Sequence, residues 1–213
     1  MYRILLVDDH AVVRKGTRAI LEDQLAGVMI SEACSGDEVL ALLTGATAPF
    51  DAMVLDLSMP GRSGIDLLTE IKHRCPKLPV LIMSLHPEEQ FAVRALQAGA
   101  SGYLSKAAAP ELLLAAVVKV AKGGRYVSEA LAERLAGDVG GRRGSAAVPH
   151  ERLSDREFEV LRAIASGQSV SDIAATMHLS VKTVSTYRAR LLEKMGMTSN
   201  AELTRYALQN QLV

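Results

Sequence analysis

The chain has 213 residues, 49% of them hydrophobic, which is enough apolar material for one large domain or two small ones. Acidic and basic residues balance at 24 each, so net charge alone does not indicate a polyanionic partner. No stretch approaches the ~20 apolar residues of a membrane span. Cys34 and Cys75 form no CxxC motif. We therefore expect a cytoplasmic, reduced protein with no membrane contact and no zinc site.

Residues 1–123 alternate short apolar runs with longer amphipathic segments. Strands that alternate with helices predict a doubly wound α/β fold, with a five-stranded parallel sheet covered on both faces. The apolar runs are residues 4–7, 28–30, 53–55, 80–83 and 103–104, and the helical patterns are residues 11–22, 37–43, 65–74, 88–98 and 111–122.

Polar side chains follow four of the five predicted strands. Asp8 and Asp9 end the first run, Asp56 the third and Ser84 the fourth, and Lys106 follows the fifth. Because ligands bind beyond the carboxyl ends of parallel strands, we expect these groups to form one site.

Acids, a lysine and a hydroxyl in one site suit transfer of a phosphoryl group to a carboxylate. Carboxylates plus waters are the ligands that Mg²⁺ prefers. The metal and the Lys106 ammonium would neutralise the phosphoryl oxygens while Asp56 attacks in line. The Ser84 hydroxyl would hydrogen-bond the product, whose added charge of about −1.5 to −2 can draw a nearby loop inward.

This set of residues resembles a response-regulator receiver domain, which has a flavodoxin-like fold. The resemblance covers nearly all of residues 1–123. It implies that a sensor histidine kinase phosphorylates Asp56 and that Lys106 contacts the phosphate. It also implies that Ser84 is the switch hydroxyl and that Tyr103 is the aromatic that swings inward on activation. It also implies a Mg²⁺ site made by Asp9, Asp56 and the backbone carbonyl of Ser58, with Asp8 holding a metal-bound water.

Two residues near Asp56 bear on alternatives. Aspartate-nucleophile phosphatases have a general acid two residues after the nucleophile, and this chain has Ser58 at that position. The missing acid argues against hydrolysis of phosphate esters. We therefore expect a protein that is not a turnover enzyme. Leu85 follows Ser84 where receivers usually have a small residue. A regulator of the same build that works without phosphate therefore remains an alternative.

Residues 124–150 are expected to form a linker. Residues 128–135 have the pattern of a short amphipathic helix, and residues 137–149 are glycine-rich without apolar periodicity. A second domain is predicted for residues 151–213.

The second domain has an all-helical pattern. Ser154 with Glu157 forms a capping box, Ser169 with Asp172 caps a short second helix, and a turn at residues 178–180 leads to a third helix at 181–195. A fourth helix is predicted at 200–209. Two helices joined by so short a turn indicate a helix-turn-helix in a four-helix domain.

The third helix has an apolar side, which includes Val184 and Leu191, and an opposite side of small polar and basic residues. Such an exposed side can reach base edges and phosphates of double-stranded DNA. An adaptor that uses these helices for protein contact is the alternative. The candidate DNA-binding residues are Lys182, Thr183, Ser185, Thr186, Tyr187, Arg188, Ala189 and Arg190.

The second domain resembles the LuxR-type DNA-binding domain through Leu153–Glu157, Ile173–Ala174, Leu179–Ser180, Lys182–Val184 and Leu191–Gly196. The whole chain is thus similar to NarL/FixJ-type response regulators. The resemblance implies major-groove contacts by Lys182, Ser185, Thr186 and Ala189, and phosphate contacts by Thr183, Tyr187, Arg188 and Arg190. Asn200 stands where the family often has arginine. We expect a phosphorylation-controlled transcription factor that binds promoter DNA as a homodimer.

Overall fold

The computed structural model describes residues 1–44, 50–59, 64–85, 88–133, 149–177, 179–210 and 212–213. Its contacts divide the chain into two compact units, Met1–Arg142 and Arg143–Val213. In the described parts, no helix combines the length and the apolar character needed to cross a bilayer.

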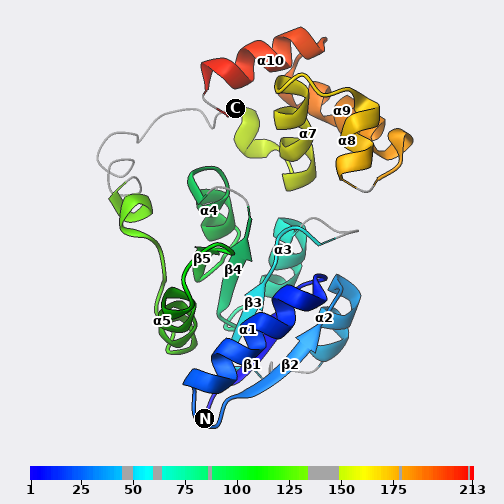
Figure 1. The fold of residues 1–213 in the computed structure, drawn as a ribbon. Helices are drawn as coiled ribbons and strands as arrows, with labels where there is room; N and C mark the ends of the chain where they lie inside the picture. The colour runs from blue at the N-terminus through cyan, green and yellow to red at the C-terminus, as the bar shows by residue number, and fades with distance from the viewer. Residues whose placement is uncertain (45–49, 60–63, 86–87, 134–148, 178, 211) are drawn as a thin grey trace. The chain divides into compact units, whose positions relative to one another are not determined.

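The first unit is built on a parallel sheet whose strand order is β2-β1-β3-β4-β5 (Figure 1). The three inner strands consist almost entirely of buried residues, which is why they stand out in the sequence as short apolar runs. The strands are β1 (Arg3–Val7), β2 (Met29–Ala33), β3 (Ala52–Leu55), β4 (Val80–Ser84) and β5 (Gly102–Ser105).

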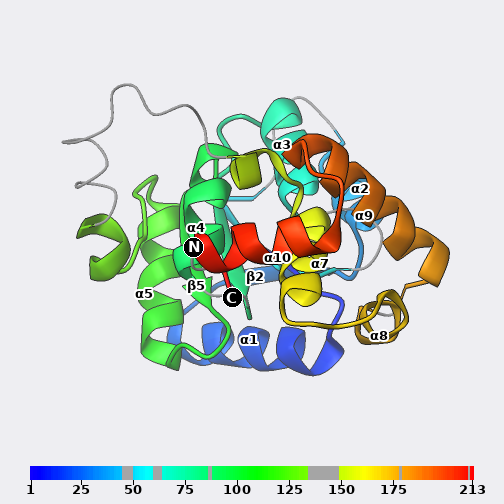
Figure 2. The same cartoon turned by 90° about the horizontal axis from the view of Figure 1, so that it is seen from above.

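Helices cover both faces of this sheet, as expected from the alternating pattern. Helices α1 and α5 contact each other and lie on one face, and α2, α3 and α4 lie on the other (Figures 1 and 2). On the first face, Ile4, Val54 and Leu81 pack with Leu21 of α1 and Val117 of α5. The helices are α1 (Ala11–Gln24), α2 (Gly36–Leu42), α3 (Gly64–Arg74), α4 (Glu88–Gln97) and α5 (Pro110–Ala121).

Strand β2 is longer than the sequence pattern predicts. It continues to Ala33 because Ser31 and Glu32, which end the apolar run, still pair in register with β1. Glu32 is held there by Arg14 and Arg18 of α1, through contacts of 2.8 and 2.9 Å. An edge strand tolerates such polar residues because only part of it is buried.

The segment after α5 returns to the sheet. Tyr126 forms a bridge with Gly102 at the start of β5, where the Tyr103 amide donates to the Tyr126 carbonyl over 3.1 Å. A Cβ on Gly102 would lie 2.5 Å from that carbonyl oxygen, so glycine permits the close approach. A helical turn follows at 129–133 with Leu131 buried, while residues 134–148 of the predicted linker lie outside the described residues.

The second unit is all-helical, as predicted. It contains a short 3₁₀ helix η1 (Pro149–Arg152) and the helices α7 (Asp155–Ala165), α8 (Val170–Thr176), α9 (Val181–Met195) and α10 (Asn200–Gln209). Helix α7 packs against both α9 and α10, and its residues Phe158, Val160 and Leu161 are buried. Helices α8 and α9 pack together and make the helix-turn-helix.

Both predicted capping boxes are present, at Ser154–Glu157 and at Ser169–Asp172. Glu157 also accepts a hydrogen bond from Lys194 near the end of α9, over 2.7 Å. One buried carboxylate therefore both caps α7 and ties it to α9.

Candidate functional site

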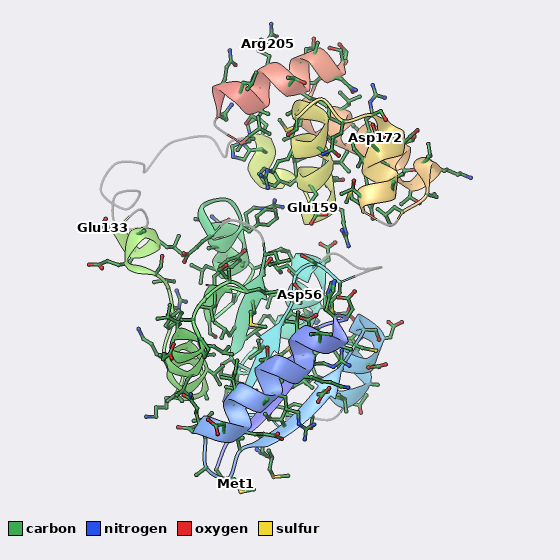
Figure 3. The ribbon with its side chains drawn as sticks, viewed as in Figure 1. Met1, Asp56, Glu133, Glu159, Asp172 and Arg205 are labelled. Atoms are coloured by element: carbon green, nitrogen blue, oxygen red, sulfur yellow. The ribbon has the colours of Figure 1, made fainter. Side chains whose placement is uncertain are left out.

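The polar residues predicted to meet at the carboxyl edge of the sheet do so. Val7 pairs with Leu55 in register, so Asp8 and Asp56 leave neighbouring strands side by side. Strand β5 ends opposite Ser84, and the Lys106 amide donates to the Ser84 carbonyl over 2.8 Å. Figure 3 shows Asp56 at this end of the sheet.

The centre of the site is a buried ion triad, which we define as Asp8, Asp56 and Lys106. The Lys106 Nζ lies 2.7 Å from Oδ2 of Asp8 and 2.7 Å from Oδ2 of Asp56. The exposed fractions of these side chains are 6% for the lysine, 4% for Asp8 and 0% for Asp56. Oδ1 of Asp56 accepts from the Ser58 amide over 3.0 Å, so both carboxylate oxygens have donors.

Burial and ion pairing have opposite effects on the pKa values of Asp56 and Lys106. Burial raises the pKa of Asp56, and the hydrogen bond and charge of Lys106 oppose this only in part. For Lys106, burial alone would lower the pKa, but hydrogen bonds and charges from Asp56 and Asp8 outweigh it and raise the pKa. The lysine therefore stays charged and compensates two carboxylates.

The same edge can hold a metal ion. Ligand atoms of Asp8, Asp9, His10 and Asp56 all lie within 4.8 Å of one another. Three of the four donors are carboxylates, which suit a hard cation that prefers oxygen. The donor set therefore fits a divalent metal, and Mg²⁺ in particular is consistent with it.

The two predicted switch residues are both interior. Ser84 is completely buried, and Tyr103 on β5 has an exposed fraction of 1%, so its side chain already points inward. Leu85 differs from them, because 72% of it is exposed. Most of Leu85 is thus accessible to solvent.

Two further residues contact the aspartates: His10, which the sequence places at the border of the site but favours as a plain loop residue, and Arg14, which the sequence analysis did not consider. His10 places Nδ1 2.9 Å from Oδ1 of Asp9, and its amide donates to Oδ1 of Asp8 over 2.8 Å. Arg14 donates to the Asp8 carbonyl and also pairs with Glu32. Arg14 thereby fixes the turn that carries the two aspartates. Its helical position one turn into α1 was the available signal.

The predicted DNA-contact residues lie on α9. Ser180 caps this helix by accepting from the Thr183 amide over 3.0 Å, and Gly196 ends it with φ +64°. Val184 and Leu191 are buried against the domain core. Three predicted contact residues, Thr183, Tyr187 and Arg188, are half-buried, and the exposed ones are Lys182, Ser185, Thr186, Ala189 and Arg190.

One contact of α9 was not foreseen. Arg188 donates from Nε to Oδ1 of Asn200, the first residue of α10, over 2.6 Å. The two residues are twelve apart in the chain and meet because the chain turns at Gly196, which brings the start of α10 next to the Arg188 side chain.

A doubly wound domain with a buried acid–lysine site, joined to a helix-turn-helix domain, defines a transcription regulator with a receiver. Residues 4–118 match the family model described as "Response regulator receiver domain", and residues 151–207 match "Bacterial regulatory proteins, luxR family". The chain belongs to the NarL/FixJ-type response regulators of two-component systems.

Curated relatives span the whole chain. Response regulator UvrY of Escherichia coli is 34% identical over 213 residues, covering 100% of this chain and 96% of that protein. Transcriptional regulatory protein UhpA of Salmonella typhimurium is 38% identical, with coverage of 95% and 96%. These matches confirm the family that the sequence motifs indicated.

Solved structures of response regulators are similar to this chain along almost its whole length. RcsB from Salmonella enterica serovar Typhimurium, described as bound to promoter rprA with phosphomimetic BeF3-, has a TM-score of 0.60 at 28% identity. The alignment covers 97% of this chain and 98% of that one. Response regulator ChrA of a heme-sensing two-component system has a TM-score of 0.50 at 32% identity, with coverage of 100% and 98%.

Proposed function

We propose that Asp56 is the phosphoacceptor of this response regulator and that its phosphorylation controls binding of α9 to promoter DNA. The observation that carries the proposal is the position of Asp56: a buried carboxylate, 2.7 Å from the Lys106 ammonium and beside Asp8 and Asp9. An isolated carboxylate would not remain charged at such a place, because desolvation costs too much.

In the proposed step, an Asp56 oxygen attacks the phosphorus atom of a phosphohistidine on a sensor histidine kinase. The new P–O bond forms as the P–N bond to the donor imidazole breaks, and the imidazole keeps that electron pair. Lys106 moves from two carboxylates to share its protons with a phosphoryl oxygen. Asp9, Asp56 and the Ser58 carbonyl would hold Mg²⁺, with Asp8 holding a water. When bound, Mg²⁺ neutralises charge on the carboxylates and phosphoryl oxygens.

The phosphorylated form then biases the switch residues. Ser84 lies at the end of β4 beside β5, where its hydroxyl can donate to a phosphoryl oxygen on Asp56. Tyr103 lies on the neighbouring strand β5, where it pairs with Ile82 of β4. A shift in this region would change the population of receiver conformations that pair two chains. Homodimers matter because two helix-turn-helix units on adjacent half-sites double the DNA contacts.

The Asp56 carboxylate takes up one phosphoryl group per chain, so we infer a stoichiometric switch and not a turnover enzyme. Intact mass after incubation with Mg²⁺ and acetyl phosphate tests this. Wild type should gain one phosphoryl group and Asp56→Asn none. Asp23→Asn, which removes an exposed carboxylate on α1, is the matched control and should be modified like wild type.

DNA binding of the same proteins completes the test. Phosphorylated wild type should bind promoter-length duplex DNA more tightly than unmodified wild type, and Asp56→Asn should not respond. Equal DNA binding by all forms would instead favour a regulator that works without phosphate.

A further inference from the structure

A side chain of α10 holds an arginine of the DNA-facing helix. Arg188 Nε donates to Asn200 Oδ1 over 2.6 Å, and Arg188 is half-buried while Asn200 is exposed. Helix α10 begins at Asn200 itself, with Ser199 as its cap, so the amide sits on a fixed backbone position. The contact therefore joins the outer side of α9 to the start of the next helix.

The partner of Arg188 is a neutral amide, so the contact does not neutralise the charge of the guanidinium. Arginine has five N–H donors in a planar fork, and in contacts with the described residues Arg188 uses only Nε. Among the described residues, no carboxylate lies in ion-pair distance of Arg188. The two Nη groups thus keep their donors, and the full positive charge is available for a bidentate contact with a phosphate.

We propose that Asn200 is a positioning residue that pre-orients Arg188 toward a DNA backbone phosphate without neutralising it. The proposal rests on the proposed role of α9 in DNA binding. In this arrangement the amide at the start of α10 orients the positive charge that α9 carries. Orienting a flexible side chain before binding reduces the entropy lost in the complex.

Substitutions at Asn200 separate orientation from charge. Asn200→Ala frees the Arg188 side chain but leaves its charge, so DNA affinity should fall about 2- to 12-fold, the range expected for immobilising one long side chain, with the salt dependence unchanged. Asn200→Asp has nearly the same shape but places a carboxylate on Nε. Affinity should fall further, and the slope of log K against log salt should shrink by about 0.9 per bound chain, as for a lost phosphate contact.

The experiment measures binding of the full-length chain to a mixed-sequence duplex of about 30 bp, long enough for two half-sites. Phosphate contacts do not depend on sequence, so an identified operator is not needed. Affinity is followed by fluorescence anisotropy from about 50 to 200 mM salt, with and without acetyl phosphate and Mg²⁺. Arg188→Ala and the double variant with Asn200→Ala should bind equally, because the amide acts only through the guanidinium.

Two controls keep the result interpretable. Arg205→Ala removes an exposed positive charge from α10, the helix that begins at Asn200. It should change the DNA affinity and the salt slope less than the substitutions of Arg188 and Asn200 do. Thermal unfolding checks folding, and Asn200→Asp should not be less stable, since an acid in the first turn of a helix is favourable.

The possible outcomes distinguish the two proposals. If wild type shows no salt-dependent DNA binding in either state, the proposed function fails. If wild type binds and Arg188→Ala weakens it, but Asn200→Ala and Asn200→Asp bind as wild type does, the positioning role of Asn200 is wrong while the proposed function stands.

Discussion

Replacing Lys106 by methionine should destabilise the receiver strongly. The substitution keeps most of the apolar stem but removes the positive charge that lies between Asp8 and Asp56, whose side chains are 4% and 0% exposed. Removing one partner from a buried ion pair typically costs 3–5 kcal/mol. We expect a loss of about 3 kcal/mol, the lower end, because the two carboxylates can protonate in part once Lys106 is absent. For a domain of this size, that corresponds to a fall in Tm of roughly 12 °C.

Circular dichroism during thermal unfolding, without Mg²⁺, measures this effect. Lys15→Met removes an exposed lysine on α1 and should stay within about 0.5 kcal/mol of wild type. Adding Mg²⁺ at about ten times its dissociation constant should raise the free energy of unfolding of Lys106→Met by about 1.4 kcal/mol, because the cation binds only the folded carboxylate cluster. The double variant Asp56→Asn/Lys106→Met should lose less than Lys106→Met alone, since one buried charge has gone. If Lys106→Met unfolds with the Tm of wild type, the triad does not form in solution and the reasoning is refuted.

Two further predictions concern a capping acid and a glycine. Burial alone would raise the pKa of Glu157, but hydrogen bonds from Lys194 and the Ser154 amide outweigh it and lower the pKa. The pKa of a glutamate in the unfolded chain is about 4.3. The resulting stabilisation is therefore fully present above about pH 5, and it is lost as the pH falls through the lower pKa of the folded state. Glu157→Gln should therefore unfold more easily than wild type at neutral pH, with the difference shrinking below about pH 4, and a constant difference would contradict this. In Gly64→Ala, the new Cβ would lie 2.5 Å from the Cα of Leu57 and shift the turn after Asp56, so mass spectrometry should record phosphorylation by acetyl phosphate up to about 100-fold slower.

The sheet and the acid–lysine site could be predicted because both depend on local pattern. Buried parallel strands are apolar runs, and the end of each run fixes where its polar residue must emerge. Asp8, Asp56 and Lys106 therefore met as expected, with no knowledge of their side-chain conformations. The position of β2 at the edge of the sheet hid its full length, because an edge strand can carry Ser31 and Glu32.

Contacts between side chains of different helices could not be predicted in the same way. The pair Arg188–Asn200 depends on the angle at which α10 leaves the Gly196 turn, and the pair Glu157–Lys194 depends on how α7 packs on α9. Sequence pattern places each residue on a face of its own helix but does not give the angle between helices. Such contacts were visible only once the packing was known.

The bridge from Tyr126 to Gly102 also determines where the receiver can be cut. Strand β5 is at the edge of the sheet, and an edge strand with open N–H and C=O groups is a template for pairing with another molecule. The segment around Tyr126 occupies that edge through hydrogen bonds to Ser101 and Tyr103. A receiver that ended at residue 123 would uncover the edge and invite strand-to-strand aggregation, whereas one that continued through residue 133 would keep it covered and retain the buried Leu131.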